Sequence, residues 1–243
     1  MKITPQYGKL AAGIFALALT SNAWAQSDPV HAHLNVGATS TAQGSALIFA
    51  NGANFVPGSG WTKPLTYIDN GVYAGYYQGG ITLTALAGTA KNSETGVAAP
   101  QAAALGSFLR AGIVSVSGPA GGSFAFWDTG ATQPTYSYTS GYSSLAPVDT
   151  WALSDAALGA GTIGADPFGH LHGRRFSATV PGDYLVTFQA IDTSVNGLGG
   201  GPIHTPSDLL TIGFSAVPEP SVYALTLLGL GGLVWAGWNR QKN

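Results

Sequence analysis

Short apolar or alternating stretches fill residues 26–217, and clusters of Gly, Pro, Asn and Asp separate them. The clearest alternation spans residues 30–36, where apolar residues occupy the even positions and His31, His33 and Asn35 occupy the odd ones. Successive side chains of an extended chain point to opposite faces. This pattern therefore predicts a half-buried strand that carries both histidines on its polar face.

Other segments with the length and composition of strands are 45–50, 66–68, 72–77, 81–87, 109–117, 123–127, 135–138, 174–180, 184–191 and 209–214. Strands of this length with turn signals between them predict an all-β fold, and we expect an antiparallel β-sandwich, Ig-like or jelly-roll-like. Pro181 and Gly182 suit the central positions of a type II turn, which predicts a hairpin there. One short helix is expected over 149–158.

The composition excludes several classes of protein. Glycine and proline occupy 35 and 14 of the 243 positions, which disfavours a helical bundle because both residues destabilise helix interiors. The hydrophobic fraction of 45% is high enough for a buried core, which disfavours disorder. Nine basic residues are too few to neutralise a run of phosphates, so no nucleic-acid partner is expected. The absence of cysteine excludes disulfides, thiol nucleophiles and Cys-based metal sites.

The N-terminal residues have the features of a secretory signal peptide. Lys2 and Lys9 supply positive charge, residues 10–20 form a short apolar segment, and Ala23-Trp24-Ala25 fits a small-x-small cleavage site. We therefore expect residues 1–25 to be a signal peptide and residues 26–217 to form the body of the protein. The alternative is an N-terminal core helix.

A second hydrophobic segment covers residues 222–238, which is about 25 Å of helix at 1.5 Å per residue, near the lower limit for a membrane span. Arg240 and Lys242 follow it, and positive residues favour the cytoplasmic side, so the body is expected outside the cytoplasm. Pro218, Glu219 and Pro220 come just before the segment.

The order Pro-Glu-Pro, short transmembrane helix and basic tip over residues 218–243 resembles the PEP-CTERM sorting signal. The resemblance implies an exosortase-type sorting machinery, a transient anchor in the inner membrane and removal of the tail during export. It also implies a Gram-negative host, with the protein in the periplasm, outer envelope or cell surface. It says nothing about what the body does.

The histidines of the body fall into two His-x-His pairs, His31 with His33 and His170 with His172, and a single His204. Residues i and i+2 of a strand share a face, so each pair can direct two imidazoles at one cation. Two such strands side by side offer four nitrogens, enough for tetrahedral Zn²⁺, and His204 replaces one of them or completes a second site. The alternatives are a solvated edge strand for the first pair and hydrogen-bonded core histidines for the second.

Two sequence phrases strengthen the zinc hypothesis. The string HAHLNVG at 31–37 resembles the opening of the PEP-CTERM family repressed by the zinc-uptake regulator, although Leu34 and Asn35 stand where a more acidic pair is expected. The strings FGHLHGRRF at 168–176 and PGDY at 181–184 resemble a phrase of surface-anchored domains associated with zinc systems. The resemblance implies expression under zinc starvation and zinc handling outside the cytoplasm.

The sequence thus predicts an exported, envelope-associated protein that captures or retains zinc. No catalytic constellation stands out, so an enzyme is not expected. A zinc uptake system or an exopolysaccharide is the expected partner of the exported body. One of Arg174 and Arg175 is expected to form a structural ion pair with Asp183 or Asp166. The alternative function is a structural or adhesive component of an extracellular polysaccharide matrix, with no role for a metal.

Overall fold

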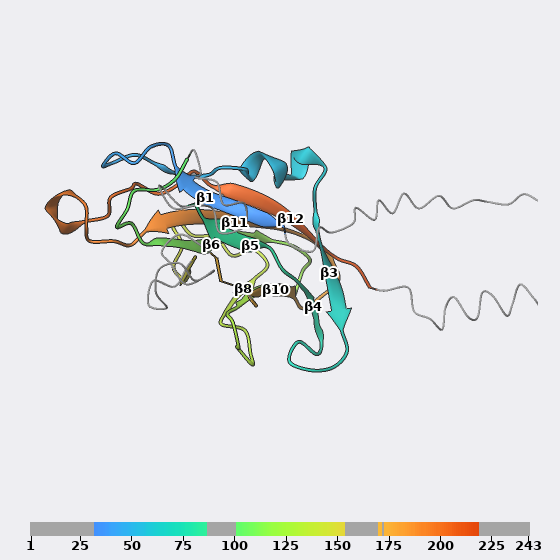
Figure 1. The fold of residues 1–243 in the computed structure, drawn as a ribbon. Helices are drawn as coiled ribbons and strands as arrows, with labels where there is room; N and C mark the ends of the chain where they lie inside the picture. Colours follow the sequence, from blue (N-terminus) through green and yellow to red (C-terminus); the bar gives the residue numbers. More distant parts are fainter. Residues whose placement is uncertain (1–31, 87–100, 154–169, 172, 219–243) are drawn as a thin grey trace, which may run out of the picture.

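The computed structural model describes residues 32–86, 101–153, 170–171 and 173–218, and these residues form an all-β fold (Figure 1). The strands are β1 (His33–Ala38), β2 (Leu47–Phe49), β3 (Lys63–Ile68), β4 (Tyr76–Gly79), β5 (Thr82–Ala85), β6 (Leu109–Ser117), β7 (Ser123–Trp127), β8 (Tyr136–Thr139), β9 (Thr150–Ala152), β10 (Arg175–Ala178), β11 (Gly182–Asp192) and β12 (Leu210–Ala216). The only helical turns in the described chain are the short 3-10 segments η1 (Gly52–Asn54), η2 (Pro57–Ser59) and η4 (Leu198–Gly200).

Nine strands form one curled sheet in the order β8-β7-β10-β4-β3-β12-β11-β6-β9. The two ends of this sheet approach each other. The ring of Phe126 on β7 stacks on Trp151 of β9, with 4.1 Å between centroids and 12° between planes. The Tyr136 hydroxyl on β8 donates a hydrogen bond of 3.2 Å to the Thr150 carbonyl on β9. The curl therefore encloses an aromatic core between the two ends of the sheet.

The core consists of the apolar side chains that the alternation in each strand directs inward. Its largest fully buried members include Phe124, Phe126, Phe176, Phe188, Phe214 and Tyr184. Phe176 lies at the centre, with ring centroids of 5.6 to 6.0 Å to Phe124, Phe126, Trp151, Phe188 and Phe214. Each buried aromatic side chain contributes roughly 1.5–3 kcal/mol of burial free energy, so this cluster stabilises the curled sheet.

A second sheet contains three strands in the order β2-β1-β5. Leu34 and Val36 of β1 are fully buried, and Leu83 and Ala85 of β5 lie in the same hydrophobic core. The alternation predicted for residues 30–36 is thus observed in the described part of that segment. The apolar face of this small sheet completes the core, and its other face carries the polar residues.

Two parts of the fold differ from the sequence prediction. The pairings of β1 with β5 and of β12 with β3 are parallel, so the sheets are not purely antiparallel. The helix expected from residue 149 is wrong at its start, because β9 pairs with β6 there and Trp151 is buried against Phe126. Tertiary packing thus overrides the local helical preference, and residues 154–158 of that prediction lie outside the described chain.

The predicted hairpin at Pro181 and Gly182 is also wrong. β10 pairs with β4 and β7, whereas β11 pairs with β12 and β6, so the chain passes from one part of the curled sheet to another. Tyr184 stabilises this crossing through a 3.0 Å hydrogen bond from its hydroxyl to the Val180 carbonyl. The PGDY phrase is therefore a structural corner in this fold.

In the part of the chain that the structure describes, no helix is long and apolar enough to span a membrane. The expected apolar span at 222–238 and the expected signal peptide at 1–25 lie outside the described residues.

Trp151→Ala tests the contact between the two ends of the curled sheet. We expect it to lower the free energy of unfolding by about 3–5 kcal/mol, because it removes a buried ring and leaves a cavity against Phe126. The control Leu145→Ala removes a fully exposed side chain and should have a much smaller effect. Urea unfolding checks both variants, and equal midpoints would contradict the role assigned to this contact.

Candidate metal centre

His33 is the first residue of β1 and lies on the face of the three-stranded sheet opposite the core. The register pairs His33 with Thr82 and Asn35 with Thr84, while Leu34 pairs with Leu83 on the buried face. His33 is partly buried. Because the face of every residue in β1 follows from the burial of Leu34 and Val36, the hydrophobic core also fixes the direction of the His33 side chain.

Asn51 holds β1 at the position of His33. The ladder between β1 and β2 ends at the pair Val36 and Phe49. Beyond it, the Asn51 side chain donates a 2.8 Å hydrogen bond to the His33 carbonyl and accepts one of 2.8 Å from the Asn35 amide. The Asn51 side chain thus pairs with the backbone of β1 in place of a further β2 residue.

His170 reaches the same face from the other side of β5. It forms an isolated antiparallel bridge with Thr84, and its side chain is fully buried. Bridged residues of neighbouring strands point to the same side of a sheet. His33, Asn35, Thr82, Thr84 and His170 therefore share one face, which we call the histidine face.

The imidazoles of His33 and His170 lie against each other, with 5.0 Å between ring centroids and 55° between ring planes. The Nε2 atom of His33 and the Nδ1 atom of His170 are shielded from solvent. Two imidazoles bound to one tetrahedral cation, with metal–nitrogen distances of about 2.0–2.1 Å, have centroids about 5 Å apart. The spacing of the two rings therefore fits ligands of one Zn²⁺ ion.

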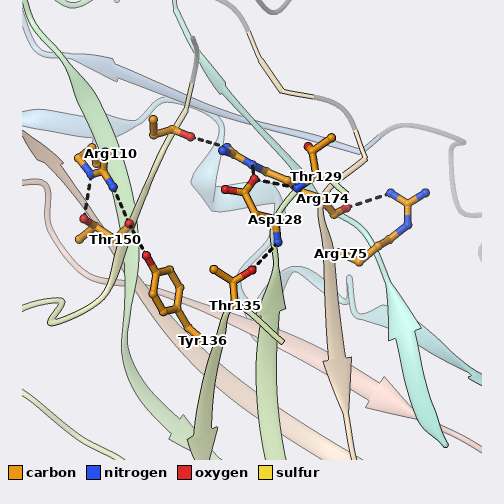
Figure 2. Close-up of polar contacts among 9 residues, drawn as sticks. Arg110, Asp128, Thr129, Thr135, Tyr136, Thr150, Arg174 and Arg175 are labelled. Atoms are coloured by element: carbon orange, nitrogen blue, oxygen red, sulfur yellow. Dashed lines mark hydrogen bonds and ion pairs between the residues drawn. The ribbon is translucent and has the colours of Figure 1, made fainter. Parts of the chain in front are cut away.

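The chain after His170 is held by Arg174, which Figure 2 shows among its partners. Its Nε donates to Asp128 at 2.8 Å in an ion pair, and its Nη1 donates to the Ala152 carbonyl on β9. The guanidinium also lies 5.7 Å from the centroid of the Phe126 ring. Burial lowers the pKa of Arg174 and the Asp128 contact opposes this shift, but an arginine stays charged in proteins.

Arg174 therefore pairs with Asp128 and not with Asp183, while Asp166, the other expected partner of the arginine pair, lies outside the described residues. Asp128 on the turn after β7 takes Arg174, whereas Asp183 accepts a 2.6 Å hydrogen bond from the Ser215 hydroxyl. The sequence did not indicate this because Asp128 and Arg174 come together only through the pairing of β7 with β10. Gly173, just before Arg174, has a φ of +84°, which lies in the left-handed region that favours glycine.

His204 is buried elsewhere in the fold and both of its ring nitrogens have protein partners. Nε2 accepts a 2.9 Å hydrogen bond from the Ala104 amide, so the neutral ring carries its proton on Nδ1. Nδ1 lies 2.9 Å from the Ser45 hydroxyl and 3.2 Å from the Ser45 carbonyl. The hydrogen bond from Ala104 occupies the Nε2 lone pair that a metal ligand would need, which fits a structural role for His204.

Asp192 fixes the backbone on which His204 stands. Its buried carboxylate accepts hydrogen bonds from the amides of Phe108, Ser194, Ile203 and His204 and from the Ser194 hydroxyl, all between 2.9 and 3.1 Å. Burial raises the pKa of Asp192, but the hydrogen bonds from Ser194, Phe108 and His204 together outweigh this effect and lower the pKa. The carboxylate therefore joins three loops at one end of the fold.

The described residues contain no group of three or more histidines, aspartates or glutamates arranged to hold a metal ion. Of the predicted ligands, His33 and His170 come together and His204 lies apart, while His31 and His172 are outside the described residues. Pro218 follows β12, and Glu219, Pro220 and Arg240 of the predicted sorting signal also lie outside them.

Sequence reasoning missed Asn51 and Thr84 on the histidine face. The alternation of residues 81–85 could have assigned Thr82 and Thr84 to one face of a strand. No local signal links either residue to His33, because the link depends on strand pairing.

Comparisons of the chain with protein-family models, curated proteins and solved structures found no match.

Asp192→Asn tests the carboxylate that supports the His204 loop. At pH 7 we expect a loss of about 3 kcal/mol, because an amide nitrogen replaces an acceptor that faces amide donors. A carboxylate whose pKa is lower in the folded state than its unfolded-state pKa of about 3.9 stabilises the fold above that pH. This stabilisation is lost as the pH falls through the folded-state pKa. The difference between wild type and variant should therefore shrink below about pH 3.9.

Urea unfolding at pH 7 and pH 3 measures this effect. Asp208→Asn, which changes an exposed carboxylate nearby, is the matched control and should have little effect at either pH. A gap between wild type and Asp192→Asn that stays constant with pH would contradict the lowered pKa.

Proposed function

We propose that this protein binds Zn²⁺ through the imidazoles of its two His-x-His pairs, and that it captures or retains zinc outside the cytoplasm. The observation that carries the proposal is the 5.0 Å approach of His33 and His170. The ligands are His33 and His170, with His31 and His172 as the neighbours that complete the set. His204 is left out of this ligand set because its Nε2 accepts from Ala104.

The contacts around the two rings favour this function over the alternatives drawn from the sequence. A solvated edge strand would leave His33 exposed to water, yet it is partly buried and packed on His170. A merely structural pair of histidines would not need to come from two copies of the same His-x-His motif. The shared motif and the shared face together support a common ligand.

The charge and rigidity of the surroundings also suit a cation. Within residues 26–217 there are ten acidic and five basic residues, so the body is mildly acidic. The charge of Arg174, four residues after His170, is balanced by Asp128 at 2.8 Å. Asn51 and the bridge at Thr84 hold both histidine backbones in place, which lowers the entropic cost of bringing the ligands together.

The proposal includes export and a sandwich architecture. The features of residues 1–25 and the Pro-Glu-Pro phrase with its apolar tail support secretion followed by exosortase-type sorting. The Tyr184 contact with Val180 is of the tyrosine-corner kind found in Greek-key sandwiches, which supports that architecture for the curled sheet. An exopolysaccharide or a zinc uptake system is the proposed partner of the mature protein.

Removing the two central histidines is the test of the ligand set. We expect His33→Ala and His170→Ala each to weaken zinc binding at least tenfold, and the double variant to abolish tight binding, because one nitrogen of the described pair is lost at each step. Isothermal titration on the purified chain measures the affinities. His204→Gln is the matched control and should lower stability while leaving the zinc stoichiometry unchanged.

Retained zinc affinity in the double variant would overturn the proposed site. A wild-type chain that contains no divalent cation as purified, and takes up none after treatment with a chelator, would instead favour the alternative function, a structural or adhesive component of a polysaccharide matrix.

The pH dependence of zinc retention is a second test. Imidazole binds a metal only when neutral, and its ordinary pKa is about 6.5. Protons compete with the cation as pH falls, so zinc should be held near pH 7.5 and released progressively below about pH 6. Equilibrium dialysis across this range checks the result. Zinc retention that does not change between pH 7.5 and 5 would argue against histidine ligands.

A further inference from the structure

Thr84 is the polar residue of β5 between the two histidine-bearing segments. It pairs with Asn35 of β1 on one side and forms the isolated bridge with His170 on the other. Register therefore places its side chain on the histidine face, next to His170 and two residues along β5 from Thr82, the partner of His33. Both neighbouring segments thus direct their side chains to the same side of the sheet as the Thr84 hydroxyl.

The hydroxyl of Thr84 is buried and has no hydrogen-bond partner among the residues that the structure describes. The residue is 5% exposed, and its Oγ1 atom is shielded from solvent. A buried hydroxyl without a partner is costly, and valine has nearly the same shape without that cost. The hydroxyl on this face therefore requires a polar partner that is not among the described residues.

We propose that Thr84 is a positioning residue of the metal centre, and that its hydroxyl hydrogen-bonds an oxygen ligand, such as water, that the bound cation carries. The inference rests on the proposed zinc function. It adds that only three of the four candidate histidines bind the cation at one time, so that one coordination position is left for an exchangeable oxygen. Such a position distinguishes a site that takes up and passes on its cation from a closed structural site, in which all four positions are filled by the protein.

Thr84→Val and Thr84→Ser separate the hydroxyl from the shape of the side chain. We expect Thr84→Val to weaken zinc binding about tenfold, as removal of a group behind the ligands does in other zinc sites, and Thr84→Ser to stay close to wild type. Competition with a chelating dye measures the affinity. Thr187→Val, which removes a hydroxyl that is paired with Thr211 on the other sheet, is the control and should leave zinc binding unchanged.

The melting temperature of the metal-free variants provides a readout independent of zinc. Thr84→Val should melt at the same temperature as wild type or higher, because it removes a hydroxyl that has no partner among the described residues. If metal-free Thr84→Val melts at a lower temperature than wild type and its zinc affinity is unchanged, the Thr84 hydroxyl stabilises the fold and not the metal site. That result would overturn the proposal. Equal loss of affinity in the Val and Ser variants would also overturn it, because packing and not the hydroxyl would then be responsible.

Cobalt(II) in place of zinc tests the exchangeable position directly. We expect added azide to change the visible absorption spectrum of the cobalt-loaded wild type, because the anion replaces the oxygen ligand. A spectrum that azide does not change would indicate a site closed by protein nitrogens and would overturn this inference while leaving the zinc function intact. A wild-type chain that binds neither zinc nor cobalt would refute the proposed function itself.

Discussion

The parallel pairing of β1 with β5 is the constraint on which the histidine face depends. Leu34 and Val36 of β1 and Leu83 and Ala85 of β5 are buried in one core, and each large apolar side chain contributes roughly 1.5–3 kcal/mol when it is buried. A shift of one residue in this register would move all of these side chains to the wrong face. The direction of His33 therefore follows from the hydrophobic effect acting on its neighbours.

His170 is fixed by different interactions. Its backbone bridges to Thr84, and four residues later Arg174 is tied to Asp128 and to the Ala152 carbonyl. The Arg174 side chain is mostly buried whereas that of Asp128 is 44% exposed, so loss of Asp128 would leave the arginine charge without its ion-pair partner. The segment that carries His170 is thus fastened to β5 of the small sheet at one end and to Asp128 and Ala152 of the curled sheet at the other.

Much of the secondary structure could be predicted from the sequence, because strand alternation is a local property. β6 and β7 begin and end at the predicted residues, and the polar face of β1 is the predicted one. The order of the strands could not be predicted. Strand β9, the separate pairing of β10 and β11, and the Asp128 partner of Arg174 all depend on contacts between distant parts of the chain.

The candidate site was predictable to the same degree. The repeated His-x-His motif predicted that two distant segments lie side by side, and His33 and His170 do lie together in the fold. His204 has the same side chain as the other candidates, so only its contacts with Ala104 and Ser45 set it apart. Asn51 and Thr84 carry no motif, and their roles follow from the register of β1 against its neighbours.

Anomalous X-ray scattering from a zinc-loaded crystal, recorded on both sides of the zinc absorption edge, tests the central claim most directly. The account predicts one strong anomalous peak between the imidazoles of His33 and His170, with zinc–nitrogen distances of about 2.0–2.1 Å to both rings. A zinc peak at another position, or none at this position in a crystal grown with zinc, would contradict it.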